Sequence, residues 1–495
     1  MRLKVVLFVN IICLPLLAQR DFSLVRDRNA LLSSGNAAAL VTFADSSISK
    51  GTVSFLHEGG NLRLPTEGQN RNVISADVSS YMRVSPSLVT FGHASYTNDY
   101  GTEMFGSMFY PSLELRPFDL ISAEEDAGSK RAELIRIVGA IGWNIWKDLS
   151  IGAKIDYTSG SYAKFKDLRH TNALMNLYSR ADLFYSLSKS YGIGLGFIYR
   201  RQTESLRFKT FGTTDAVYTT LVDYANGYGE TETFGVEGFT DGGQEQPLFS
   251  EYTGLSANTK VGFVTLGITY LHRHGYYGRK TQYDVLYENH SGDQFAYSAR
   301  ADIVNNRDAL LWIDMQLQTE RLSSYRSNYR RVTSENNSSL TYYEYYEPTK
   351  MSDKAQWSGK INISGYWKPK GDIYLWYAVA GTDYFHNKQT AYLYPNIYTS
   401  TSHVLSPYAD VKRSLLFKNS SLLSFEVGGS TYFGLLKQLH TTLKTTYEIP
   451  IRHTNIRPNV SLRYDYYKFK NKDYEENIYI IYSIVDNSSH ICTNK

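Results

Sequence analysis

Cysteine is nearly absent from this sequence of 495 residues. Of its two cysteines, Cys13 lies in an N-terminal apolar stretch that we expect to be cleaved off, and Cys492 lies close to the C-terminus. A single remaining cysteine excludes an intramolecular disulfide and a cysteine-based metal cluster. We therefore predict no metal and no cofactor.

Long apolar runs are missing as well. After residue 18 no stretch of about 18 apolar residues remains, and the mean hydropathy is −0.35, which excludes a helical membrane protein. A β-barrel stays open, because only every second residue of a barrel strand is apolar. An excess of one charge is also missing: 52 Lys and Arg face 48 Asp and Glu. This balance argues against a nucleic-acid partner.

The clearest pattern in the chain runs from Ile135 to Tyr157. Apolar residues occupy every second position on both sides of Lys147 and Asp148, with polar residues between them. A period of two predicts strands with two unlike faces. Runs of about ten residues match one tilted crossing of a bilayer. The pattern predicts a membrane-spanning hairpin.

Short and long connections alternate along the sequence. Tight turns are expected at residues 85–87, 147–148 and 188–190, and long loops at 100–130 and 205–250. This rhythm is typical of a barrel whose two rims face different sides of a membrane. We predict an all-β fold, a transmembrane antiparallel β-barrel of about 14 strands, with 12 and 16 as alternatives. A soluble antiparallel sandwich shows the same alternation, but its strands are shorter.

The N-terminus has the features of a secretory signal. Arg2 and Lys4 precede an apolar stretch, residues 5–17, and Ala18 offers a cleavage point. We expect a signal peptide at residues 1–18, a periplasmic or lumenal cap or plug at 19–47, and a barrel with long extracellular loops at 48–495. This organisation predicts the bacterial outer membrane as the location.

The segment from Ser34 to Leu40 resembles the Asn-Pro-Ala segment near the start of outer-membrane long-chain fatty-acid transporters. In that superfamily an N-terminal hatch lies inside a 14-stranded barrel. The resemblance implies that Gly35, Asn36 and Ala37 belong to a plug. Ala37 stands where those transporters have proline.

A closer resemblance is to a poorly characterised group of Bacteroidota outer-membrane barrels of similar length. Residues 88–96, which read LVTFGHASY, and residues 167–172, which read DLRHTN, suggest it. The resemblance covers essentially the whole mature chain. It implies location and fold, and it carries no established activity.

Charged residues on the polar faces of the strands should point into the barrel, because a charge facing lipid costs about 2–4 kcal/mol near the bilayer midplane. Two readings stay open: these residues line an aqueous path and select solutes, or they pair with one another and close the interior. The predicted lumen-facing residues are Lys154, Asp156, Arg200, Glu426, Arg463 and Asp465.

Histidines are the strongest candidates for catalysis or metal binding, and they are weak ones. His272 and His274 share one face of a strand, and His170 and His453 each lie beside arginine. Nothing in the sequence supplies a third ligand or a nucleophile. We predict rim or loop histidines and no enzyme.

Together these patterns predict an outer-membrane barrel involved in the uptake or passage of a small hydrophobic or amphiphilic solute. Its expected partners are outer-membrane lipids and the barrel assembly machinery. The alternative is a non-transporting subunit that docks a surface lipoprotein or a TonB-dependent receptor through its long loops. The loop tyrosines at residues 342–346 suit such docking, although they fit an interfacial aromatic girdle as well.

Overall fold

The computed structural model describes most of the chain from Phe22 to Tyr432, together with residues 455–465 and 482–484. Between residues 22 and 432 the gaps are residues 23, 46, 60–67, 189, 212–215, 236–237, 282, 335–336, 371–372 and 417–421. The predicted signal peptide lies outside the described residues.

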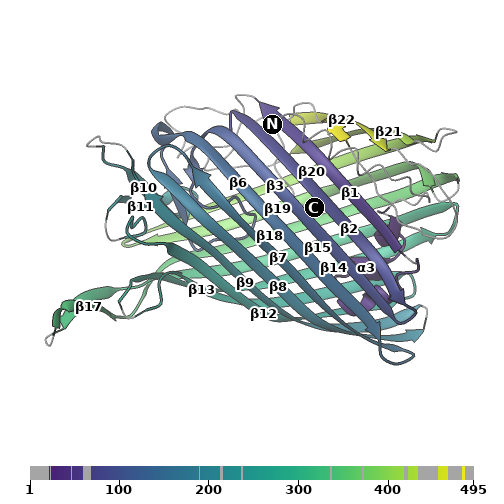
Figure 1. The fold of residues 1–495 in the computed structure, drawn as a ribbon, viewed down its shortest axis with the longest axis horizontal. Helices are drawn as coiled ribbons and strands as arrows, with labels where there is room; N and C mark the ends of the chain where they lie inside the picture. The colour runs from purple at the N-terminus through teal and green to yellow at the C-terminus, as the bar shows by residue number, and fades with distance from the viewer. Residues whose placement is uncertain are drawn as a thin grey trace, which may run out of the picture.

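Seventeen described strands form one antiparallel sheet, in which each strand pairs with the next strand of the same sheet. The strands are β1 (Ser47–Gly59), β2 (Asn70–Ser85), β3 (Leu88–Met104), β6 (Gly128–Asn144), β7 (Leu149–Lys164), β8 (Arg169–Ser188), β9 (Tyr191–Lys209), β12 (Gln246–Val261), β13 (Val264–Gly278), β14 (Leu286–Asn305), β15 (Ala309–Arg326), β18 (Thr349–Lys370), β19 (Ile373–Leu393), β20 (Asn396–Leu416), β21 (Leu422–Tyr432), β22 (Asn455–Asp465) and β23 (Tyr482–Ile484). The last strand, β23, lies beside β1, so the sheet curls into a barrel (Figure 1).

The predicted fold class is confirmed. The sheet has seventeen described strands, against about 14 expected, and fourteen of them, from β1 to β20, have 13 to 22 residues. The three strands after them are shorter. Strands of this length exceed the roughly 9–11 residues needed to cross a bilayer, so they extend beyond one membrane thickness.

The alternation of the sequence becomes an outer and an inner face of the barrel. On β6 and β7, Ile135, Ile137 and Ile155 point outward and are 53%, 55% and 56% exposed. The side chains of Lys154 and Asp156, on the other face of β7, are 27% and 14% exposed and point inward. Because the side chains of a strand alternate between its two faces, this assignment determines which face each of the remaining residues of the hairpin occupies.

The two ends of the barrel differ. At the turn end, the described strands are joined by a few residues each, for example 86–87, 145–148 and 262–263. At the loop end, longer connections hold extra elements. These are β4 (Gly106–Ser107), β5 (Asp119–Ser122), η2 (Glu124–Asp126), β10 (Thr219–Ala225), β11 (Tyr228–Thr233), β16 (Tyr329–Ser334) and β17 (Asn337–Tyr345).

A small second sheet covers part of the loop end. The strand order of this sheet is β11-β10-β5-β4. Its apolar side chains pack against the loop-end parts of the barrel strands and form one buried cluster with them. Phe109, Phe118 and Tyr277 lie within this cluster and are fully buried. The β16–β17 ribbon, in contrast, extends away from the barrel, at the lower left of Figure 1.

Three short helices of the N-terminal segment, defined here as residues 24–45, lie at the turn end: α2 (Leu24–Asp27), α3 (Ala30–Ser33) and η1 (Ala37–Thr42). Asn29 and Asn36 each begin a helix, since their side chains accept hydrogen bonds from backbone amides of the first turn. Leu24 packs on Trp312 and Tyr366 of the barrel wall. Apolar burial on opposite walls thus ties the segment to the barrel.

No helix among the described residues is long and apolar enough to cross a membrane.

Candidate functional site: the lumen between two inserted segments

The N-terminal segment is bound to the inner wall of the barrel through Asn36. The Asn36 side-chain amide donates to Oδ1 of Asn258 on β12 (2.9 Å) and to the carbonyl of Leu183 on β8 (3.1 Å). Its carbonyl oxygen accepts from the amides of Ala38 and Ala39. One buried asparagine therefore begins η1 and anchors it to two strands.

A buried ion pair on β8 holds the same segment. The Arg180 guanidinium donates to both carboxylate oxygens of Asp182 (2.7 and 2.5 Å), and the amide of Ala37 donates to Asp182 at 2.8 Å. The side chains of Arg180 and Asp182 are 6% and 0% exposed. Gly152 of β7 is needed here, because a Cβ at this position would lie 2.2 Å from the Ala38 nitrogen.

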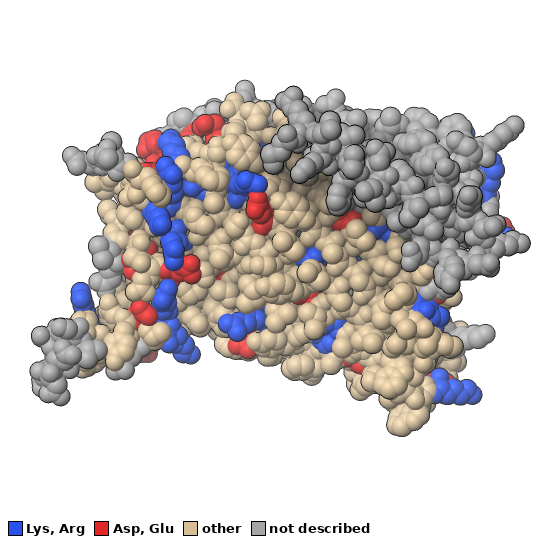
Figure 2. Space-filling model, in the orientation of Figure 1, with Lys and Arg blue, Asp and Glu red and all other residues tan. Residues whose placement is uncertain are grey.

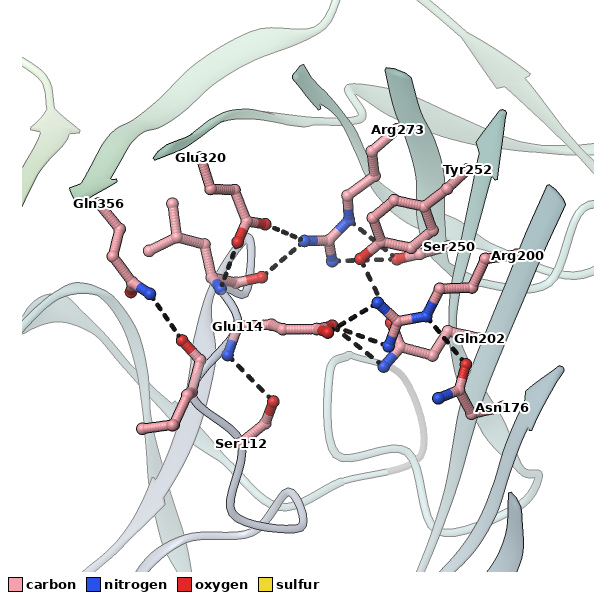
Figure 3. A network of polar contacts seen from close by, with 12 residues as sticks. Ser112, Glu114, Asn176, Arg200, Gln202, Ser250, Tyr252, Arg273, Glu320 and Gln356 are labelled. Carbon is pink, nitrogen blue, oxygen red and sulfur yellow. Dashed lines mark hydrogen bonds and ion pairs between the residues drawn. The ribbon is translucent and has the colours of Figure 1, made fainter. Parts of the chain in front are cut away.

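A second segment enters the barrel from the loop end. The inserted loop, residues 108–118 between β4 and β5, carries Glu114, which forms a bidentate ion pair with Arg200 of β9 (2.7 and 3.2 Å; Figure 3). Gln202 donates to the same carboxylate at 3.2 Å. Burial opposes ionisation of Glu114, but the charge of Arg200 outweighs it and holds the pKa of this carboxyl below its ordinary value. The contact is therefore an ion pair at neutral pH.

The inserted loop also contacts strands on the other side of β12. Arg273 of β13 donates to the carbonyl of Leu115 (2.6 Å) and to Glu320 of β15 (3.1 Å). Gln356 of β18 donates to the carbonyl of Leu113 at 2.9 Å. Figure 3 shows these side chains converging on the loop from separate strands. The loop is thus fixed across the wall from β9 to β18.

A cavity of about 400 Å³ lies in the inner wall between the two inserted segments. The lining residues come from β6 to β9. Arg200, which is paired with Glu114 of the inserted loop, bounds the cavity toward the loop end. Arg180, which lies opposite Lys154 in the strand register, adjoins it toward the turn end. The residues that line it are Arg136, Lys154, Asp156, Thr158, Asn176, Tyr178 and Arg200.

A second cavity, of about 480 Å³, lies at the turn end between the N-terminal segment and the wall. Leu24, Phe43 and Phe184 line it together with Lys260 of β12. The two cavities lie on opposite sides of the contacts that η1 makes with β7 and β8.

The structure places three of the six predicted lumen residues together. Lys154, Asp156 and Arg200 face inward and line the same cavity. Glu426 lies on β21, and Arg463 and Asp465 lie on β22; the side chains of these three residues lie outside the described part of the structure.

The three predicted plug residues lie inside the turn end of the barrel. Asn36 and Ala37 are buried and contact the wall, whereas Gly35 is exposed and takes a positive φ of 76°. A positive φ favours glycine, so Gly35 sets the turn between α3 and η1.

The histidines are dispersed. His272 and His274 face outward, where they contact Asp293 (3.0 Å) and Glu251 (3.5 Å), and both are at least half exposed. His170 is the second residue of β8, at the loop end of the strand, where it is buried beside Asn172. His453 lies outside the described residues. Among those that are described, no group of three His, Cys, Asp or Glu could hold a metal ion.

Four residues that matter here are absent from the predicted lumen set: Arg136, Asp182, Glu114 and Arg273. Arg136 and Asp182 occupy inward positions of predicted strands, so the same alternation could have found them. Glu114 pairs with Arg200, 86 positions away, and Arg273 binds the carbonyl of Leu115, 158 positions away, both through an irregular loop. No local pattern announces such a contact.

Comparison with known proteins gives a family match. The model of a "Family of unknown function (DUF6850)" matches residues 37–485. No curated protein matches the sequence.

Several solved structures are similar at a low level. The outer-membrane transporter YddB from Escherichia coli is 10% identical with a TM-score of 0.38, over 80% of this chain and 61% of that one. The toluene transporter TbuX of Ralstonia pickettii is 10% identical with a TM-score of 0.29, over 82% and 90%. The toluene transporter TodX of Pseudomonas putida is 10% identical with a TM-score of 0.27, over 84% and 94%. The chain spans less than two thirds of YddB, and likenesses this weak add nothing to what the strand pairing shows.

Proposed function

Since the chain belongs to a family of unknown function, DUF6850, we propose its function from its geometry: an outer-membrane β-barrel that passes a small amphiphilic solute through a lumen closed by parts of its own chain. The observation that carries this proposal is the pair of segments inserted from opposite ends, with a polar cavity between them.

The outer face of the barrel supports the membrane part of the proposal. Large apolar side chains such as Ile137, Leu195 and Phe197 are more than half exposed on it. Full burial of one such side chain is worth about 1.5–3 kcal/mol, so water is a poor solvent for this face and lipid a good one. In Figure 2 the middle of the visible face has few charges, and Lys and Arg gather toward the loop end. Outer-membrane lipids are accordingly the expected partners.

The inner face supports a selective path rather than an open pore. The N-terminal segment packs on the inner wall at the turn end, and the inserted loop lies across the wall at the loop end. Each is held by hydrogen bonds and ion pairs, which can exchange partners, and not by covalent links. A solute that reaches the cavity has to displace one segment to enter and the other to leave.

The character of the cavity supports an amphiphilic solute over a purely hydrophobic one. Three of its lining residues are cationic and one is anionic, and the ring of Tyr178 supplies its largest apolar surface. A hydrophobic solute would displace water from these charged groups without replacing its hydrogen bonds, which is costly.

Planar-bilayer conductance of the purified full chain tests the proposal. A Cβ added at Gly152 would meet η1, so Gly152→Ala should displace the N-terminal segment and raise the ion conductance several-fold over the wild type. Gly139, on β6, has no atom within 4 Å of an added Cβ, so Gly139→Ala should leave the conductance unchanged. A barrel that stays sealed in both variants would contradict a transport role.

A second candidate function, docking of a surface lipoprotein or a TonB-dependent receptor, is supported by the β16–β17 ribbon that extends from the barrel (Figure 1). Tyr345 and Tyr346 are 41% and 54% exposed at its base. Affinity purification of the native chain from outer membranes distinguishes this alternative. A stoichiometric partner that is lost after deletion of residues 330–344 would favour it, and an isolated monomer would count against it.

A further inference from the structure

The cations of the lumen cavity differ in how fully they are paired. The Arg136 guanidinium donates to both oxygens of Asp156, at 2.8 and 2.6 Å. Arg200 is paired with Glu114 and also donates to Asn176 at 2.9 Å. Both guanidinium groups therefore have carboxylate partners at hydrogen-bond distance.

Lys154 is the exception. Its Nζ lies 3.8 Å from Asp156, beyond hydrogen-bond distance, and 5.6 Å from the centre of the Tyr178 ring. That carboxylate is already engaged by Arg136 on both oxygens. Among the described residues, no acceptor lies within hydrogen-bond distance of the Lys154 ammonium group.

The surroundings of Lys154 are also rich in positive charge. Arg136, Arg180 and Arg26 of the N-terminal segment repel its ammonium group, whereas Asp156 attracts it. An anion placed between Lys154 and Arg200 would relieve this repulsion and would give Lys154 an acceptor. Lys154 is thus the one cation lining this cavity that has no carboxylate of a described residue at hydrogen-bond distance, and its nearest carboxylate, Asp156, is already engaged by Arg136.

The remaining lining residues limit what the anion can be attached to. The Tyr178 ring offers a flat apolar surface, and the Thr158 hydroxyl and Asn176 amide offer neutral polar contacts. The cavity volume, about 400 Å³, lies within the range of sites that bind small organic molecules.

We propose that this cavity is a binding site for a small organic carboxylate, whose anionic group pairs with Lys154 beside Arg200 and whose apolar part lies on Tyr178. This inference rests on the proposed transport function and names the class of solute. Asp156 holds Arg136 in place and keeps the site from accepting a second anionic group.

Isothermal titration of the full chain in detergent tests the binding site. The probes are benzoate and hexanoate, each compared with its neutral amide, benzamide or hexanamide. We expect the carboxylates to bind at least tenfold more tightly than the amides, and the difference to shrink with added salt, since the site acts through charge.

Substitutions assign the effect to Lys154. Lys154→Gln should weaken benzoate binding at least tenfold and leave benzamide binding unchanged, and Lys154→Arg should restore most of the affinity. Lys260→Gln is the matched control, because Lys260 lines the other cavity; it should have no effect. Circular dichroism and heat-modifiable gel migration of each variant check that the barrel is folded.

The proposal is overturned if carboxylates and amides bind equally, if neither carboxylate binds, or if Lys154→Gln and Lys260→Gln behave alike. Flux of labelled benzoate into liposomes is measured separately. Binding without flux would keep the site and reject transport, whereas flux that is the same in Lys154→Gln and wild type would keep transport and reject the site.

Discussion

At the residue scale, the lumen depends on a few buried charged side chains, each of which has several contacts. Asp182 accepts from the Arg180 guanidinium and from the Ala37 amide, so one carboxylate neutralises a wall cation and holds the N-terminal segment. Arg273 likewise joins Glu320 to the inserted loop. Removing one member of such a pair destabilises the folded protein, because the other member is left charged, buried and unpaired.

We predict that Asp182→Asn lowers the free energy of unfolding by about 3–5 kcal/mol, the usual cost of breaking a buried ion pair from one side. Arg131 and Glu133 provide a matched control, because they form an ion pair at the same spacing but are 47% and 41% exposed on the outer face. Glu133→Gln should change stability by about 0–1 kcal/mol. Denaturant titration in lipid vesicles measures both. Equal effects would contradict the structural role given to Asp182.

At the scale of elements, regular alternation made the strands predictable and irregular segments made the site hard to predict. The hairpin expected at residues 135–157 is β6 and β7, and Lys154 and Asp156 lie on its inward face. The inserted loop lies in a stretch with Pro111 and Pro117 that sequence reasoning described only as a long loop. Its position depends on contacts with strands that are distant in the sequence, such as the ion pair of Glu114 with Arg200, 86 positions away, and these strands become its neighbours only when the barrel forms.

The second sheet at the loop end should respond to pH through Asp223 of β10. Burial raises the pKa of this carboxyl to about 6 from an ordinary value of 3.8, even though its Oδ1 accepts from the amides of Ala225 and Gly227. The folded state thus binds the proton more tightly than the unfolded state. Stability from this group is therefore greatest at low pH, falls as pH rises from about 4 to about 6, and stays at its lowest above that range.

We predict that Asp223→Asn, which stays neutral and keeps the acceptor oxygen, is more stable than the wild type at pH 7.5 by about 2–3 kcal/mol. At pH 4 the two proteins should differ little. Heat-induced unfolding in detergent, followed by gel migration, measures the difference. A variant less stable at pH 7.5 would mean that attraction between Asp223 and Lys354 outweighs the cost of burial.

At the scale of the whole molecule, the barrel combines an apolar exterior, which suits lipid, with two segments of its own chain that bind to the inner wall, one at each end. The period of two in the sequence was enough to predict which side chains form the outer face. The position of the N-terminal segment could not be predicted in this way. It depends on contacts of Leu24 with Trp312 and of Asn36 with Asn258, residues that come near the segment only in the folded barrel. A plug was predicted from a family resemblance only, and the contacts that hold the N-terminal segment are known from the structure alone.

The central claim is that small solutes pass through this lumen, and solute flux into liposomes tests it most directly. Liposomes with the full chain should admit a small solute such as labelled benzoate faster than protein-free liposomes, and should exclude a tetrasaccharide. Gly152→Ala should admit the small solute faster still, because the added Cβ displaces η1. Liposomes that stay as tight as protein-free ones, with the wild type and with Gly152→Ala alike, would contradict the account.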